Sequence, residues 1–162
     1  MLISTKMKVD VPKIKGAVKG KFSLGSNSNK IAVFVDGPNL LRKEFNFDLR
    51  DLKNEVEKLG KISIAKVFLN QFAPEKLIEA ISSEGMESVI TPVDPDVALA
   101  VEVMEAVYNP NIDTICVVTR DGDFQPPIMK AKQHGKHTIA IGVRKNLSES
   151  LINSVDRFIE IT

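Results

Sequence analysis

The feature that most constrains the fold of this chain is a repeated alternation between short apolar runs and longer segments with helical periodicity. Ile31–Val35 is a continuous apolar run rich in β-branched residues, which is typical of a strand buried on both faces. Five further runs of this kind follow along the chain: Ile62–Leu69, Met86–Ile90, Ile112–Thr119, His137–Gly142 and Arg157–Ile161. Such strands predict a sheet whose two faces are both covered.

Helices are predicted between these runs. Their expected extents are Asp48 to Leu59, Pro74 to Gly85, Asp96 to Val107, Asp123 to His134, and Ser148 to Ser154. Strands that alternate with helices of about ten residues indicate right-handed crossovers, and therefore an α/β domain with a parallel sheet. In such sheets, ligands bind beyond the carboxyl ends of the strands, where the strand order reverses. That edge is where we look for functional residues.

The N-terminal segment differs in charge from the rest of the chain. Residues 1–30 hold seven lysines and one acid, whereas the whole chain has a net charge of +1, so the remaining residues are net acidic. Met7, Val9 and Val11 alternate with polar residues as in an exposed edge strand, and a flexible basic arm is the equal alternative. We therefore expect residues 1–29 to form a basic arm or edge strand with a polar linker, followed by one domain over residues 30–162.

Composition excludes several other classes. The chain is 43% apolar and 27% charged, as in ordinary globular domains. No apolar run reaches the roughly 18 residues that cross a membrane, and the N-terminus lacks the apolar stretch of a secretory signal, so we expect a cytoplasmic protein without a membrane partner. A single cysteine, Cys116, excludes an intrachain disulfide and is expected in the core. His134 and His137 do not have zinc-site spacing.

Three aspartates stand at or just beyond the predicted carboxyl ends of strands. Asp36 ends the first strand, Asp96 begins the helix after the third, and Asp121 follows the fourth. Two carboxylates about 5 Å apart repel by roughly 3 kcal/mol at an effective dielectric near 20, so gathered acids need protons, cationic side chains or a metal. Oxygen ligands suit a hard dication, and we expect Mg²⁺ or Mn²⁺.

Each acid also has a purely structural interpretation. Asp36-Gly37-Pro38-Asn39 and Asp121-Gly122 are typical of turns. Asp96 and Asp123 could serve only as N-caps, and for Asp123 the cap and the ligand are equal alternatives. Glu102 lies about 120° from Asp96 around a regular helix, so we expect it to reach the same point only as an outer group. Taken together, the acids at one edge favour a site over separate structural roles.

Three separated motifs of the chain resemble those of the NYN family, in the LabA-like branch of the PIN-like nucleases. They are VFVDGPNL at 33–40, DVALAVE at 96–102 and TRDGDF at 119–124, the last followed by AKQHGK at 131–136. The likeness covers about residues 30–160, with the motifs in the family's order. Any one of these motifs alone would be weak, whereas the three together are specific.

The resemblance implies a three-layer α/β/α, Rossmann-like PIN fold with a mostly parallel central sheet. It also implies a Mg²⁺- or Mn²⁺-dependent site that hydrolyses RNA phosphodiester bonds, as in an endoribonuclease. The implied catalytic residues are Asp36, Asp96, Asp121 and Asn39, and the implied metal ligands are Asp36, Asp96, Asp121, Asp123 and Glu102. The alternative is a non-catalytic RNA-binding or regulatory module that retains the acidic metal site.

Two residues depart from the family pattern. Glu102 stands where an aspartate is usual, which preserves the charge but lengthens the reach of the side chain. Arg120 stands where a small residue is usual, and its guanidinium would either bind a phosphate or neutralise the acids. We expect both departures to affect the rate of RNA cleavage more than the binding of metal or RNA.

RNA carries charge of the same sign as the acidic domain, so basic residues outside the acidic site are expected to hold it. The expected RNA contacts are Arg120, Lys13, Lys15, Lys19 and Lys21, with Lys130, Lys132, Lys136, Arg144 and Lys145 as a second basic margin. Solubilising surface is the equal alternative for these side chains. Aromatic residues make up only 6% and tryptophan is absent, which gives no support for a base-stacking platform. A homodimer is one of the assemblies left open.

Overall fold

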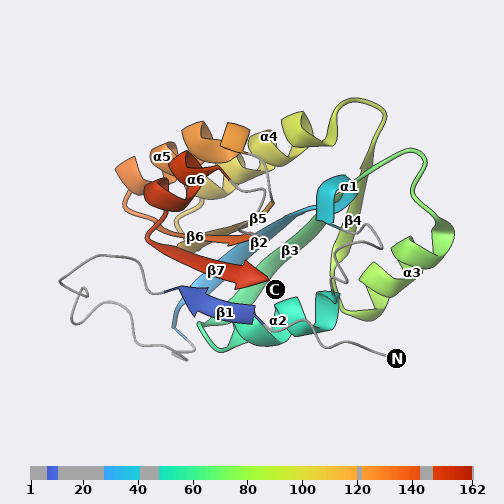
Figure 1. Cartoon of the computed structure of the whole chain (residues 1–162), viewed down its shortest axis with the longest axis horizontal. Helices are drawn as coiled ribbons and strands as arrows, with labels where there is room; N and C mark the ends of the chain where they lie inside the picture. The colour runs from blue at the N-terminus through green and yellow to red at the C-terminus, as the bar shows by residue number, and fades with distance from the viewer. Residues whose placement is uncertain (1–6, 11–27, 41–47, 120–121, 143–147, 162) are drawn as a thin grey trace.

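A computed structural model of the chain shows three layers, with helices on both faces of a central sheet (Figure 1). The structure describes residues 7–10, 28–40, 48–119, 122–142 and 148–161. In this part of the chain, no helix has both the length and the apolar character needed to cross a membrane. The predicted fold class, a three-layer α/β/α domain with a mostly parallel sheet, is confirmed.

The sheet has seven strands in the order β1-β7-β6-β5-β2-β3-β4. Their bounds are Met7–Asp10 (β1), Lys30–Asp36 (β2), Lys61–Asn70 (β3), Glu87–Thr91 (β4), Thr114–Val118 (β5), His137–Gly142 (β6) and Arg157–Ile161 (β7). The strands from β2 to β7 are parallel, and β1 pairs antiparallel with β7 at one edge. Residues 7–10, for which an edge strand and an arm were equal alternatives, are thus a strand.

The helices divide between the two faces of the sheet. Their bounds are Gly37–Leu40 (α1), Leu49–Glu57 (α2), Glu75–Ser83 (α3), Pro95–Val107 (α4), Gln125–Gln133 (α5) and Glu149–Ser154 (α6), with a 3₁₀ turn η2 at Gly122–Phe124. Side chains of α2 and α3 pack on one face, and those of α4, α5 and α6 pack on the other. The bounds of these elements, apart from α1 and η2, agree with the sequence prediction to within two residues.

Alternation along β2 assigns its side chains to the two faces. Val33 and Val35 belong to the core under α2 and α3, whereas Ala32 and Phe34 belong to the core under α4 and α5. Even-numbered residues of β2 therefore face α4, because side chains of a strand alternate between faces. Cys116, in β5, is fully buried as predicted, and burial raises the pKa of its thiol, which keeps the sulfur protonated.

The strand order reverses between β2 and β5. The chain builds β2, β3 and β4 outward in one direction, and α4 then carries it back across the sheet to β5 on the other side of β2. The two crossovers that leave β2 and enter β5 thus run on opposite faces. Between the carboxyl ends of such strands the helices diverge, which is where open α/β sheets bind ligands.

Two predicted helix caps are wrong. Asp94, rather than Asp96, is the N-cap of α4, and its Oδ1 accepts a hydrogen bond from the Asp96 N–H at 3.0 Å. Asp123 does not cap α5, because an intervening 3₁₀ turn places Phe124 at the cap position without a side-chain hydrogen bond. The predicted cap Asp48 is confirmed, since its carboxylate accepts from Arg50 N at 2.8 Å.

Asn29 fixes the amino-terminal end of β2. Its side-chain amide donates to Leu59 O at 2.9 Å and accepts from the Thr114 hydroxyl at 2.8 Å, so one buried side chain joins the start of β2 to the segments entering β3 and β5. Gly60 lies so close that an added Cβ would come within 2.4 Å of Asn29 O. The central strands are therefore held in register at the end opposite the candidate site.

We expect Asn29→Ala to lower the free energy of unfolding by about 2–3 kcal/mol, because a buried carbonyl and a buried hydroxyl both lose their partner. Urea denaturation measures the change. The matched control is Asn54→Ala, since Asn54 is exposed on α2, and its unfolding free energy should stay within about 0.5 kcal/mol of the parent. Equal stability of the two variants would contradict this role for Asn29.

Candidate functional site

Asp36 is a buried carboxylate at the reversal of strand order. It ends β2 and is only 1% exposed, and its even position directs the side chain toward α4. Thr119, the residue directly after β5, donates its hydroxyl to Asp36 Oδ2 at 3.1 Å. Buried carboxylates are costly unless hydrogen bonds or charges compensate for lost hydration, so their presence at a ligand-binding edge favours a functional role.

Gly37 sets the direction in which the chain leaves β2. An added Cβ would lie 2.5 Å from Phe68 O and 2.6 Å from a methyl carbon of Leu69, both on β3. The chain therefore passes against β3 before it turns into α1, and only glycine fits at this distance. The turn interpretation of residues 36–39 is wrong, because β2 ends at Asp36 and the helix α1 begins at Gly37.

Asp96 is the second residue of α4, which packs against β2 and β3. Leu99 and Val103 are the buried residues of the same helix, and Asp96 precedes them by three and seven positions. Residues at this spacing share a helix face, so Asp96 lies on the side of α4 that faces the sheet. Asp36 and Asp96 consequently occupy the same edge and the same face of the sheet.

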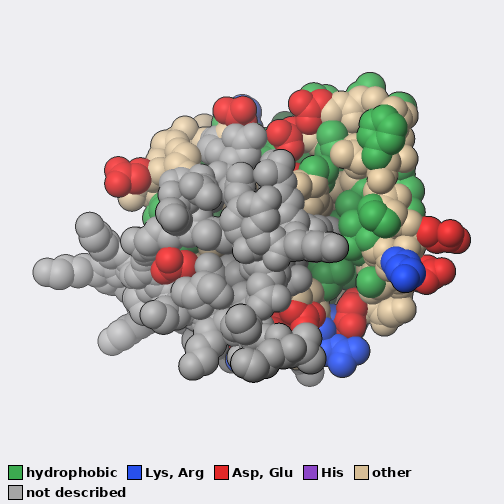
Figure 2. Space-filling model, turned by 45° about the vertical axis from the view of Figure 1, so that its right-hand side comes forward, with side chains coloured by type: hydrophobic (Ala, Val, Ile, Leu, Met, Phe, Trp, Pro, Cys, Tyr) green, Lys and Arg blue, Asp and Glu red, His purple; other side chains and the backbone are tan. Residues whose placement is uncertain are grey.

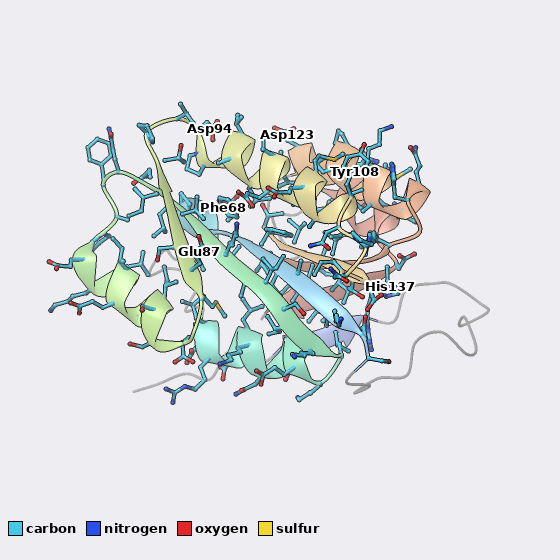
Figure 3. The ribbon with its side chains drawn as sticks, turned by 180° about the vertical axis from the view of Figure 1, so that it is seen from behind. Phe68, Glu87, Asp94, Tyr108, Asp123 and His137 are labelled. Atoms are coloured by element: carbon cyan, nitrogen blue, oxygen red, sulfur yellow. The ribbon has the colours of Figure 1, made fainter. Side chains whose placement is uncertain are left out.

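Of the remaining predicted site residues, the structure places Asp123 but not Asp121. Asp123 is exposed in η2, just beyond β5, and Figure 3 shows it and Asp94 on the side of the sheet that α4 covers. Asp121 and Arg120 lie outside the residues that the structure describes, as does the side chain of Asn39. In the described ranges, no group of three acids, histidines or cysteines is arranged to hold a metal.

Glu102 has a partner that the sequence analysis did not consider. Its Oε2 lies 2.8 Å from Lys66 Nζ, and both side chains are less than one-third exposed. The hydrogen bond to Glu102 raises the pKa of Lys66 above its ordinary value, so the lysine stays charged. Lys66 lies on β3 opposite Phe34 of β2, two residues before Asp36. This ion pair joins α4 to β3 and occupies the carboxylate of Glu102.

The basic margin predicted on α5 and the following turn has structural roles at two of its positions. Lys132 Nζ donates to Ser154 O at 3.0 Å, at the end of α6. Lys136 Nζ donates to Asn109 O at 2.7 Å, at the amino-terminal end of the parallel strands. Both ammonium groups bind backbone carbonyl groups away from the acidic edge, and their contact with RNA stays a prediction. The other three members are exposed Lys130, and Arg144 and Lys145, which lie outside the described residues.

The expected RNA contacts Lys13, Lys15, Lys19 and Lys21 likewise lie outside the described residues. Among the residues that are described, hydrophobic side chains gather on the right-hand part of the surface in Figure 2. Phe72, Ile90 and Val93 are exposed by 80%, 49% and 60%, and they come from the segments that follow β3 and end β4. An apolar margin therefore lies on the β4 side of the carboxyl edge, and the sequence analysis did not predict it.

The described acids near this edge carry the oxygen donors that a hard dication prefers, but they do not by themselves form a group that could hold one. Asp36 and Asp96 offer carboxylate oxygens from one edge and one face, and Asp123 adds another beyond β5. Oxygen ligands of this type suit Mg²⁺ or Mn²⁺. Two site features could have been anticipated from sequence. Thr119 stands inside the third motif, and Lys66 is the one charged residue in the apolar run Ile62–Leu69.

Comparisons with known proteins bear on the family and on the fold of the chain. A family model described as the NYN domain matches residues 30–162. An uncharacterized protein of Methanocaldococcus jannaschii is 50% identical over 133 residues, a match that covers 82% of this chain and 55% of that protein. The chain therefore spans little more than half the length of this relative. The crystal structure of a protein of unknown function from Vibrio parahaemolyticus has a TM-score of 0.74 at 23% identity, over 82% of this chain and 93% of that one, which supports the fold.

The fold and the matching family model define a nuclease-like α/β/α domain of the PIN type. The chain belongs to the NYN domain family, over residues 30–162.

We expect Gly37→Ala to destabilise the fold by about 2–3 kcal/mol, because the new methyl group meets a backbone oxygen of β3 that cannot move aside. Chemical denaturation measures the loss. Gly135→Ala is the matched control: Gly135 has a φ of 77° but open space around it, so only the cost of the left-handed conformation, about 1–2 kcal/mol, should appear. A Gly37→Ala variant as stable as the parent would show that β3 does not constrain this turn.

Proposed function

We propose that the chain is a metal-dependent ribonuclease of the LabA-like branch of the NYN family, hydrolysing RNA phosphodiester bonds. The observation that carries the proposal is the buried Asp36 carboxylate at the reversal of strand order, with Asp96 on the same edge and face. Neither residue is explained by turn or capping chemistry alone, because Asp94 fills the cap position and Asp36 faces the interior. Family membership supports the nuclease class.

The residues proposed to hold Mg²⁺ or Mn²⁺ are Asp36, Asp96 and Asp121, with Asp123 as a fourth oxygen donor. Such an ion supplies Lewis-acid stabilisation of the charge that develops on a phosphodiester during hydrolysis. We assign Glu102 a different role from the metal ligation that the resemblance implied. Its carboxylate is paired with Lys66 and fixes α4 against β3, which positions Asp96.

Neighbouring side chains of this protein orient the carboxylate of Asp36. The Thr119 hydroxyl holds one oxygen of Asp36, and burial limits the directions in which this carboxylate can turn. Asn39, in the short helix α1 that follows Asp36, is proposed to orient a water molecule or the substrate. RNA would be held by basic residues away from the acids, namely Arg120 and the N-terminal lysines, through counterion release.

We expect Asp36→Asn to lower cleavage of labelled single-stranded RNA in Mn²⁺ by at least about 10³-fold, since the variant loses a charged ligand of the ion that stabilises the transition state. Chelation with EDTA should abolish parent activity. Asp51→Asn is the matched control, because Asp51 lies on α2, on the opposite face of the sheet. If the parent binds RNA but does not cut it with either metal, the chain is instead the non-catalytic module.

Removal of the charge at Glu102 should have a different effect from its removal at Asp96. We expect Asp96→Asn to weaken Mn²⁺ binding by at least about tenfold, whereas Glu102→Gln should change it by less than about threefold and lower stability by about 1 kcal/mol. Isothermal titration with Mn²⁺ and urea denaturation give the two quantities. If both variants lose Mn²⁺ affinity to a similar extent, Glu102 is a metal ligand after all.

A further inference from the structure

Helix α4 is apolar on two opposite faces. Its inner face packs on the sheet through residues that are at most 3% exposed, namely Leu99, Val103, Ala106 and Val107. Its outer face carries Val97 and Val101, exposed by 58% and 62%, and Tyr108 at its C-cap, exposed by 63%. A helix that is apolar almost all round is normally covered on both sides, whereas a surface helix has a polar outer face.

The outer apolar residues follow the spacing of a helix–helix contact. Val97, Val101 and Tyr108 are exposed, whereas Met104 is partly buried and also packs against the core. We call these four residues the α4 seam, and they are separated by four, three and four positions. This is the spacing with which one helix packs along another. Tyr108 is held at its end of the seam by an edge-on contact with His134 of the α5 C-terminus, with ring centroids 4.9 Å apart. Figure 3 shows Tyr108 toward the end of α4 opposite Asp94.

We propose that the α4 seam is the interface of a homodimer, in which α4 packs antiparallel against α4 of a second copy about a twofold axis. In this register Val97 lies opposite Tyr108 of the second copy, and Val101 lies opposite Met104. The pattern is self-complementary, as an isologous contact requires, because the larger side chains of one half face the smaller ones of the other. The two helix dipoles are antiparallel in this arrangement, which also favours the pair.

The charges that flank the seam fit the same register. Glu105 borders the seam, and in the antiparallel pair it faces Ala98 of the second copy rather than another acid. Glu102 is turned away toward β3 and is neutralised by Lys66. Like charges therefore do not meet across this contact, although α4 itself carries only acidic charged residues, Asp96, Glu102 and Glu105. Those acids would repel a nucleic-acid backbone, which favours a protein partner for this face.

The dimer leaves both acidic edges open. A helix of 13 residues is about 20 Å long, and antiparallel packing places the two copies of Asp96 at opposite ends of the seam. The interface does not depend on the proposed nuclease activity, because none of its residues belongs to the candidate site. Since one helix pair is smaller than a standard interface of about 800 Å² per partner, we expect a dissociation constant in the micromolar range.

Sedimentation velocity over about 1–100 μM protein tests the proposal. The parent chain should pass from monomer to dimer in this range, and Val101→Glu should raise the dissociation constant by at least about 100-fold, because a charge would be buried in the seam of both copies. Met129→Glu is the matched control: Met129 is exposed on α5, outside the seam, and its variant should dimerise like the parent. A parent that stays monomeric at 100 μM, or a Val101→Glu dimer of unchanged affinity, would overturn the proposal.

A cross-linking experiment tests the register without relying on a disruptive charge. Val101→Cys places two thiols near the twofold axis, and a short bismaleimide should join them in high yield, whereas Met129→Cys should give monomers. The native thiol does not interfere, because Cys116 is fully buried and remains protonated. Equal cross-linking of both variants would contradict the seam as the interface. Cleavage of RNA can be measured in the same samples, so loss of the dimer and loss of nuclease activity are separable.

Discussion

The hydrogen bond from Thr119 to Asp36 joins the two strands between which the strand order reverses. It connects residues that are 83 positions apart in the chain, at the carboxyl ends of β2 and β5. The bond forms only if β5 lies beside β2, which requires α4 to carry the chain back across β3 and β2. The placement of a buried carboxylate at the candidate site therefore depends on the whole topology of the sheet.

Two further constraints position the same edge. Gly37 allows the chain to pass against β3 immediately after Asp36, and the Lys66–Glu102 ion pair ties α4 to β3. At the opposite end of the strands, Asn29 joins the start of β2 to segments leading into β3 and β5. The acidic edge is thus supported by close packing and by partly buried polar contacts, which limit how far Asp36 and Asp96 can move relative to each other.

Helix α4 contributes residues to the core, to the candidate site and to the surface of the molecule. Its inner face belongs to the core, its first turn presents Asp96, and its outer face carries the apolar seam. These roles use different sides of one helix. The proposed contact between two copies would account for the apolar residues on the outer face of α4. Packing on the sheet alone does not require apolar residues on that face.

Strand burial and helix periodicity are local properties that a single segment displays, so the fold class and most of the elements follow from the sequence, whereas α1 and η2 do not. The sequence also marked Asp36 and Asp96 as acids at the ligand-binding edge. The pairings between distant residues appear only in the folded chain: Lys66 with Glu102, Thr119 with Asp36, and Lys136 with Asn109. The same holds for the choice of Asp94 over Asp96 as the cap. Contacts between distant segments depend on strand order, register and helix rotation, and a shift of one residue in any of these would turn the same side chains to the opposite face.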